Sequence, residues 1–159
     1  MEFRKITNEN IWDVVKLQVK EDQRQFVANN TVSLLEAYAT QNEGGKVQAF
    51  AIYEKDALVG FVMINFDVAY WEGAPAVARH NYCLWRFMID QNYQGQGLGK
   101  KALAKVIDYV KTMPLGQGNK IYLSYVPGNK RGAKLYEDAG FAPNGEMDGP
   151  EIVLVLDLK

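Results

Sequence analysis

Met88-Ile-Asp-Gln-Asn-Tyr-Gln-Gly-Gln-Gly-Leu-Gly-Lys-Lys-Ala102 is the stretch that decides the fold of this chain. Strand-forming residues 82–89 lead into it, and apolar residues at helical spacing follow it from residue 98 to residue 110. Its three glycines therefore lie at a strand-to-helix junction. Glycine tolerates unusual backbone dihedrals and leaves room for a ligand, and the first turn of a helix offers unpaired amides and a positive dipole end. This combination predicts an anion site, and phosphates are the anions that such junctions bind.

The spacing of the loop separates the classes of phosphate ligand. A Walker loop is excluded at two positions, because Gln94 stands in place of its first glycine and Lys101 in place of its Ser or Thr. The motif Gly97-x-Gly99-x-x-Ala102 fits the relaxed dinucleotide fingerprint. That fingerprint also requires an acidic residue at the end of the next strand, and residues 120–126 contain none. A dinucleotide site is therefore the weakest alternative.

The loop Gln94-Gly-Gln-Gly-Leu-Gly99 resembles the Arg/Gln-x-x-Gly-x-Gly/Ala loop with which GNAT-superfamily N-acetyltransferases hold the pyrophosphate of acetyl-CoA. The preceding residues, Arg86–Asp90, resemble the end of that family's fourth strand. A later stretch, Asn129–Phe141, resembles a second family motif, in which Asn129 and Tyr136 lie seven residues apart. Two motifs in the right order, separated by a helix and a strand, are more specific than either alone. The resemblance covers most of the chain from about residue 47 onward.

The resemblance implies an acetyl-CoA-dependent N-acetyltransferase with the α/β GNAT fold, a mixed, mostly antiparallel sheet of about seven strands flanked by about four helices. In the family, an amide on the fourth strand donates to the acyl carbonyl, and here that amide belongs to Phe87. Met88 and Ile89 would bind the pantetheine arm, and Tyr136 would act as general acid. The other cofactor-binding residues implied are Gln94, Gly95, Gln96, Gly97, Leu98, Gly99, Lys100 and Asn129.

Each of these residues also has an ordinary structural interpretation. A tyrosine on an amphipathic helix is by default a partly buried core residue, and an asparagine after Pro-Gly is by default a helix cap. The two-motif context favours the functional role of Tyr136, while Asn129 can perform both roles. Lysines and arginines on helices are usually solvated. Lys100 is the best placed of the candidate phosphate contacts, which are Lys100, Lys101, Lys130, Arg131 and Lys134.

The amine acceptor is less well defined than the cofactor. In eukaryotic diamine acetyltransferases an acidic residue lies on the fourth strand, where this chain has Trp85 and Arg86, so no general base is assigned. Residues 21–30 and Trp85–Asp90 more closely resemble bacterial spermine/spermidine acetyltransferases. Acidic and aromatic residues would suit a polycation through ion pairs and cation-π contacts. The candidates are Glu21, Asp22, Tyr38, Glu72 and Trp85, each of which is otherwise a surface or core residue.

The composition is that of an ordinary globular protein, which predicts one domain over residues 1–159. The net charge of −1 shows no basic excess, so neither nucleic acid nor a membrane is expected as a partner. Cys83 is the only cysteine, so no internal disulfide forms, and His80 and Cys83 lack partners at metal-ligand spacing. No targeting pattern is present, which favours the cytoplasm. Family analogy implies a homodimer.

Hydrophobic periodicity predicts the remaining elements. A helix capped by Thr7 or Asn8 is expected to run to about Val19, and a second is expected to turn Val32, Leu35, Tyr38 and Ala39 toward the core. Asn129 should cap a helix that ends at Gly140. Besides 82–89, strands are expected at residues 3–6, 47–53, 58–66, 121–126 and 152–158.

The favoured function is acetyl transfer to a primary amine of a polyamine such as spermidine or spermine, by direct attack in a ternary complex. Two alternatives stay open. The acceptor can be another amine, in an aminoglycoside-like drug or a protein, or the chain can be a non-catalytic acyl-CoA sensor on the same fold. Retention of both Asn129 and Tyr136 argues against the sensor.

Overall fold

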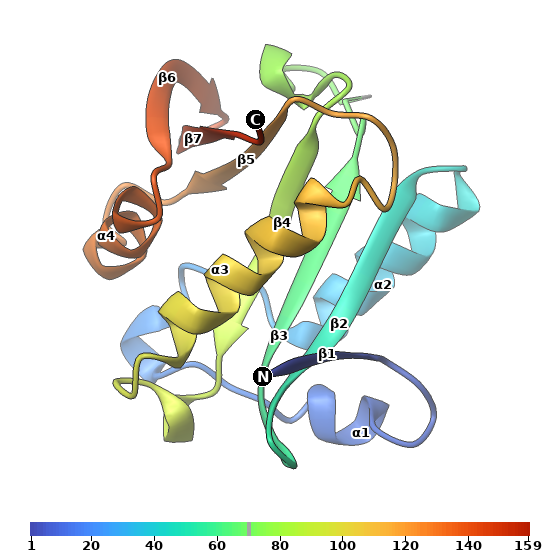
Figure 1. Cartoon of the computed structure of the whole chain (residues 1–159), viewed down its shortest axis with the longest axis vertical. Helices are drawn as coiled ribbons and strands as arrows, with labels where there is room; N and C mark the ends of the chain where they lie inside the picture. The colour runs from blue at the N-terminus through green and yellow to red at the C-terminus, as the bar shows by residue number, and fades with distance from the viewer. Residues whose placement is uncertain (70) are drawn as a thin grey trace.

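A computed structural model describes residues 1–69 and 71–159, which form one seven-stranded sheet in the order β1-β2-β3-β4-β5-β7-β6 (Figure 1). The strands are β1 (Glu2–Lys5), β2 (Lys46–Glu54), β3 (Ala57–Phe66), β4 (Tyr82–Ile89), β5 (Lys120–Tyr125), β6 (Ala142–Asp148) and β7 (Glu151–Asp157). The α-helices are α1 (Ile11–Val14), α2 (Asn30–Asn42), α3 (Leu98–Lys111) and α4 (Lys130–Asp138). Three 3₁₀ turns are η1 (Glu21–Gln23), η2 (Ala76–Ala78) and η3 (Gln91–Tyr93). This architecture confirms the predicted fold class.

Helices cover both faces of the sheet. On one face α3 packs through Ala102, Leu103, Val106 and Val110, and the same apolar cluster includes Leu135, Tyr136 and Phe141 around α4. On the other face, α1 and α2 pack against β2, β3 and β4. Figure 1 shows α3 in front of the sheet and α2 behind it. The core is therefore two apolar layers, one on each side of the sheet.

The sheet is divided between β4 and β5. These strands are parallel and pair only through Tyr82 with Ile121 and Cys83 with Tyr122, whereas every other neighbouring pair is antiparallel. Beyond Cys83 the two strands separate (Figure 1). On its other edge β4 carries a register shift, since Arg86 pairs with Met63 and Leu84 with Ile64, which leaves Trp85 as the extra residue of a bulge. The split and the bulge both lie at the middle of β4.

The first helix is much shorter than the sequence pattern predicts. The expected helix to about Val19 is wrong, because α1 ends at Val14. The amide of Gln18 donates to Oδ2 of Asp90 at 2.9 Å, and the carbonyl of Gln18 accepts from the amide of Gln91 at 2.7 Å. These bonds draw residue 18 to the end of β4 and take its backbone groups out of a helical ladder.

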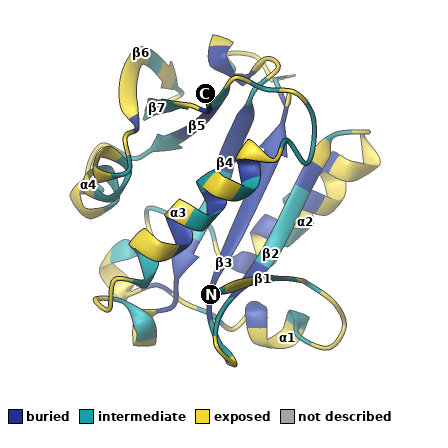
Figure 2. Cartoon of the chain, in the orientation of Figure 1, coloured by how far each residue is buried: buried dark blue, intermediate teal, exposed yellow. Residues whose placement is uncertain are grey.

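The helix α2 is rotated relative to the prediction. Val32, Leu35, Tyr38 and Ala39 were expected in the core, but all four residues are exposed, and Leu35 and Tyr38 are 64% and 67% exposed. Figure 2 shows both exposed and buried stretches along α2. The buried face of α2 consists of the smaller residues Asn30, Ser33, Ala37 and Thr40. Small side chains let a helix approach a sheet closely, and the polar ones find partners there. Asn30 donates to the carbonyl of Val14 at 2.8 Å, and Ser33 donates to the carbonyl of Asn29 at 3.1 Å.

The strand β6 was not among the strands expected from periodicity. Its residues, Ala-Pro-Asn-Gly-Glu-Met-Asp, lack the apolar alternation of a half-buried strand. It pairs with β7 at the edge of the sheet, where backbone hydrogen bonds to one neighbour are sufficient. The expected last strand, β7, consequently lies inside the sheet between β5 and β6.

Candidate active site

A cavity of about 1370 Å³ occupies the split between β4 and β5. One end is lined by the glycine loop before α3 and by α4, and the other by β3, β4, β5 and the β6–β7 turn. Residues 23–28, between η1 and α2, line it as well, and Phe26 lies beside Gly128 of the β5–α4 loop. This volume exceeds the range of about 300–1,000 Å³ that is typical of a site for one drug-sized ligand.

The glycine loop has the backbone geometry that the predicted anion site requires. Gly95 and Gly97 have φ angles of 82° and 76°, in the left-handed region that favours glycine, and a Cβ at either position would meet nothing within 4 Å. Gly97 is the N-cap of α3, so the amides of Leu98, Gly99 and Lys100 belong to the first turn, where the helix itself supplies no acceptor. Gly99 has no left-handed φ, so its role differs from that of the other two glycines.

Buried polar contacts hold this loop in place. The carboxylate of Asp90, which is 5% exposed, accepts from the amides of Gln18 and Asn92 at 2.9 and 3.0 Å and from the Asn92 side chain at 2.9 Å. Gln94 donates to the carbonyl of Ile89 at 2.9 Å. The side chain of Gln94 is thus engaged in structural bonds, which leaves its backbone to contact a phosphate. The structural role of Asp90 was not predicted from the sequence, although its position between a strand and the glycine loop was a usable signal.

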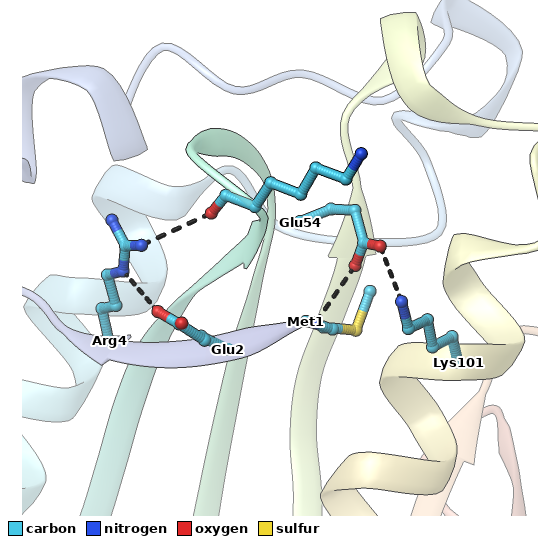
Figure 3. A network of polar contacts seen from close by, with 6 residues as sticks. Met1, Glu2, Arg4, Glu54 and Lys101 are labelled. Carbon is cyan, nitrogen blue, oxygen red and sulfur yellow. Dashed lines mark hydrogen bonds and ion pairs between the residues drawn. The ribbon is translucent and has the colours of Figure 1, made fainter.

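Cationic side chains gather at the same end. Lys100, Lys130, Arg131 and Lys134 line the cavity, and Lys134 also bonds to Asp138 at 3.0 Å. Lys101 does not line it, because its ammonium pairs with Glu54 at 2.6 Å (Figure 3). The hydrogen bond from Lys101 lowers the pKa of Glu54. Lys101 therefore ties α3 to β2, and the basic end of the cavity is made by the other four residues.

The free edge of β4 faces the separated β5. Phe87, Met88 and Ile89 line the cavity beyond Cys83, the last residue of β4 that pairs with β5. An extended ligand arm can pair with a strand edge of this kind as another strand would. The three residues implied for acyl and pantetheine binding are thus on the wall where such an arm would lie.

The helix α4 presents Tyr136 and Asn129 to the cavity. Asn129 caps α4 by accepting from the amide of Gly132 at 2.9 Å, and a Cβ at Gly132 would lie only 2.5 Å from Asn129 Nδ2. This close approach explains the small residue in the motif. Tyr136 is half-buried with its ring 6.1 Å from that of Phe141, and burial raises its pKa to about 12. The phenol therefore keeps its proton at neutral pH, and the expected helix cap at Asn129 is confirmed.

The sequence-predicted acceptor residues are dispersed. Trp85 lines the cavity, but Glu21, Asp22 and Glu72 are exposed and do not line it. Tyr38 lies on the exposed face of α2.

Two of the predicted cofactor residues of the loop, Gln96 and Leu98, also do not line the cavity. Gln96 donates to the carbonyl of Asn92 at 3.4 Å. The structure brings together the cofactor candidates far more than the acceptor candidates.

Other residues that line the cavity were not singled out from the sequence. They include Asn65, Ser124, Asp148 and Glu151, and none belongs to a recognisable motif. Arg86 lines it too, and its guanidinium pairs with Glu36 of α2 at 2.6 Å. These residues come from β3, β4, β5 and the β6–β7 hairpin, so only the folded chain assembles them.

His80 and Cys83 form no reactive pair in the structure. Cys83 is buried, which raises the pKa of its thiol to about 12, so the thiol is protonated at neutral pH. His80 is exposed and lies 3.4 Å from a carboxylate oxygen of Asp67. Among residues 1–69 and 71–159, no cluster of His, Cys, Asp and Glu suits a metal ion, and no helix is both long and apolar enough to cross a membrane.

The features of the cavity fit acetyl-CoA. The first-turn amides and four cations suit its phosphates, the free edge of β4 suits its pantetheine arm, and a protonated phenol lies on the same wall. The fold and this site define an acetyl-CoA-dependent acyltransferase.

Comparison with known proteins gives the family. Residues 12–141 match the model of the Acetyltransferase (GNAT) family, so the chain belongs to the GNAT N-acetyltransferases, which use acetyl-CoA. It is 32% identical over 159 residues to the spermine/spermidine N(1)-acetyltransferase of Bacillus subtilis (strain 168), covering 98% of this chain and 97% of that one.

Solved structures share the fold. Aminoglycoside acetyltransferase AAC(6')-Ib in complex with coenzyme A superimposes with a TM-score of 0.76 at 17% identity, covering 98% of this chain and 93% of that one. Spermidine N-acetyltransferase from Vibrio cholerae, in complex with CoA and spermine, gives a TM-score of 0.67 at 17% identity, covering 99% and 95%. At this identity the likeness concerns the fold alone.

Proposed function

We propose that this enzyme acetylates a primary amine of a polyamine such as spermidine or spermine, by direct attack of the amine in a ternary complex with acetyl-CoA. The observation that carries the proposal is one continuous cavity with a basic end at α3 and α4 and an acidic end at the β6–β7 turn. An anionic cofactor and a cationic acceptor can therefore enter from different ends and meet beside β4. The name of the Bacillus subtilis relative supports a polyamine acceptor.

Each task that concerns acetyl-CoA has a candidate group in this cavity. Bound acetyl-CoA supplies an activated acyl group. The amides of the loop and the first turn of α3, with Lys100, are proposed to hold its phosphates, and Met88 and Ile89 its pantetheine arm. The amide of Phe87 is proposed to donate a hydrogen bond to the acyl oxygen. Tyr136 Oη, whose pKa is raised to about 12 by burial, holds the proton that the leaving sulfur needs.

The test is release of CoA thiol from acetyl-CoA with spermidine, spermine or no acceptor. Turnover with a polyamine and none in the blank supports the proposal. Turnover restricted to an aminoglycoside or a lysine-containing peptide would replace the polyamine by one of those amines. CoA binding in a thermal-shift assay without turnover on any amine would favour the acyl-CoA sensor.

Acceptor binding by the predicted acidic residues and the homodimer both stay predictions. Binding of the acceptor by Glu21, Asp22 or Glu72 is tested by neutralising each carboxylate and measuring the KM for spermidine. The homodimer is tested by light scattering, because the chain mass is 17.9 kDa and a dimer has twice that mass.

A further inference from the structure

The turn between β6 and β7 brings two carboxylates into the cavity. Asp148 and Glu151 are a register pair across the hairpin, both line the cavity, and both are half-buried. Glu151 Oε2 accepts from Ser124 Oγ at 2.6 Å. Neither carboxylate forms an ion pair with a cation in the described part of the chain. Two half-buried negative charges without a counter-charge favour the binding of a cation.

The charges of these carboxylates affect Cys83, which also lines the cavity. Burial is the main cause that raises the pKa of the Cys83 thiol. The negative charges of Asp148 and Glu151 raise this pKa further. A hydrogen bond from Tyr122 and the positive charge of Arg86 lower it. Cys83 is the register partner of Tyr122 on one side and of Asn65 on the other. The hairpin carboxylates therefore act on the same part of the sheet as Asn65.

Asn65 is a second and independent sign of a ligand. It is 3% exposed, it lines the cavity, and its Oδ1 has no hydrogen-bond partner among the described residues. Buried polar atoms in native proteins are almost always paired, so an unpaired carbonyl oxygen in a cavity wall calls for a donor. A ligand N–H group would supply that donor.

We infer that Asn65, Asp148 and Glu151 form the subsite that binds the ammonium groups of a polycationic acceptor, at the end of the cavity opposite the phosphate loop. This inference rests on the proposed function and names the residues that recognise its acceptor. The carbonyl oxygen of Asn65 accepts one N–H bond, and the two carboxylates neutralise the charge. Trp85 lines the same cavity, and the guanidinium carbon of Arg86 lies 5.5 Å from the centre of its ring.

The charge distribution along the cavity sets the direction of binding. Lys100, Lys130, Arg131 and Lys134 at the opposite end repel a polycation and attract phosphates. Arg86 of β4 also lines the cavity, and its guanidinium pairs with Glu36 at 2.6 Å, so part of its charge is neutralised. A polyamine is therefore favoured in the subsite of Asn65, Asp148 and Glu151 and disfavoured in the cofactor end.

The test compares Asp148→Asn and Glu151→Gln with wild type. Each variant keeps its shape and loses one charge, so the KM for spermidine should rise about tenfold in either and further in the double variant. The KM for acetyl-CoA and the melting temperature should stay unchanged. Asp157→Asn is the matched control, because Asp157 lies on the same strand but is exposed and does not line the cavity. An unchanged spermidine KM in the double variant would overturn the subsite.

Two further variants separate recognition from stability. Asp148→Glu keeps the charge and should retain a spermidine KM within about threefold of wild type. Asn65→Leu has a similar size and removes an unpaired oxygen, so the melting temperature should not fall while the spermidine KM rises. A fall in melting temperature with no change in KM would show that Asn65 has a structural role only.

Binding measured without turnover keeps the two proposals distinguishable. Calorimetric titration of spermine into the CoA-loaded protein reads the subsite directly. If wild type binds spermine, the double variant does not, and neither turns over, the subsite stands and the proposed reaction fails. If wild type acetylates spermidine and the double variant does so with the same KM, the reaction stands and the subsite fails.

Discussion

Gln94, in the loop before α3, and Gln23, in η1, exchange two side-chain hydrogen bonds of 2.8 and 3.1 Å across 71 residues of sequence. Gln94 also bonds to the carbonyl of Ile89 at the end of β4. The segment 23–28, which lines the cavity, is thereby fastened to the loop proposed to hold the phosphates. Binding of the cofactor and placement of this segment are therefore expected to be linked.

Gln23→Ala should weaken that link. The loss of two hydrogen bonds from a half-buried pair costs about 1 kcal/mol, so the KM for acetyl-CoA should rise several-fold. Amide hydrogen exchange should also become faster in residues 20–28. Gln41→Ala is the control. This variant also loses a side-chain hydrogen bond, from Gln41 to the carbonyl of Val47, but Gln41 does not line the cavity. Equal behaviour of the two variants would contradict the linkage.

Tyr136→Phe removes the phenol and leaves the ring contact with Phe141 in place. Loss of a general acid should lower kcat about 100-fold with little change in CoA affinity. The measurement is steady-state thiol release together with a CoA titration. Tyr125→Phe serves as control, because Tyr125 packs in the same core cluster but does not line the cavity. An unchanged kcat would remove Tyr136 from the acid role.

The pH dependence of the reaction should follow from two groups, the amine of the acceptor and the phenol of Tyr136. A free alkyl amine with a pKa of about 10.4 gains neutral form as the pH rises, so kcat/KM should increase from pH 7 to about pH 9. Burial raises the pKa of Tyr136 to about 12, so its phenol stays protonated and able to donate throughout this range. No alkaline fall is therefore expected below about pH 10. An alkaline limb that disappears in Tyr136→Phe would show that its pKa is lower.

The glycines of the loop should differ in their tolerance of side chains. Gly97 has a φ of 76°, so Gly97→Val forces a β-branched residue into the left-handed region and should weaken CoA binding by about 100-fold or more. A Cβ at Gly99 would make ordinary contacts of 3.7 Å with Leu135 and 3.8 Å with Ile89, so Gly99→Ala should change the Kd less than about threefold. Calorimetric titration of CoA measures both. Similar losses of CoA affinity in the two variants would contradict the expectation that only Gly97 requires a left-handed backbone conformation.

The rotation of α2 is testable through stability. Leu35 is 64% exposed, so Leu35→Lys should change the unfolding free energy by less than about 0.5 kcal/mol. Ala37 is 6% exposed on the opposite face, so Ala37→Lys should destabilise the protein by more than about 2 kcal/mol. Urea unfolding of the two variants gives the comparison. A larger destabilisation by Leu35→Lys than by Ala37→Lys would support the orientation of α2 that hydrophobic periodicity predicts.

Elements whose chemistry is local could be predicted from the residues alone. The loop from Gly95 to Gly99, the N-cap at Asn129 and the strand Tyr82–Ile89 depend on backbone dihedrals, side-chain capping and residue alternation, all of which are set within a few residues. These elements are enough to identify the family motif and the cofactor end of the cavity. In contrast, Glu21, Asp22 and Glu72, the acidic residues predicted from the sequence to bind the acceptor, do not line the cavity.

Contacts between distant residues set the end of α1, the orientation of α2 and the placement of Asn65, Asp148 and Glu151 along one cavity. Each depends on contacts between distant residues, such as Gln18 with Asp90, Asn30 with Val14, and Ser124 with Glu151. Such contacts satisfy buried polar groups that a periodicity argument counts as solvent-facing. The carboxylates of Asp148 and Glu151 look like surface charges in the sequence and become cavity walls when the β6–β7 hairpin folds beside the split sheet. The glycine loop follows from local backbone chemistry, whereas the residues proposed to bind the acceptor come together only through non-local strand pairing.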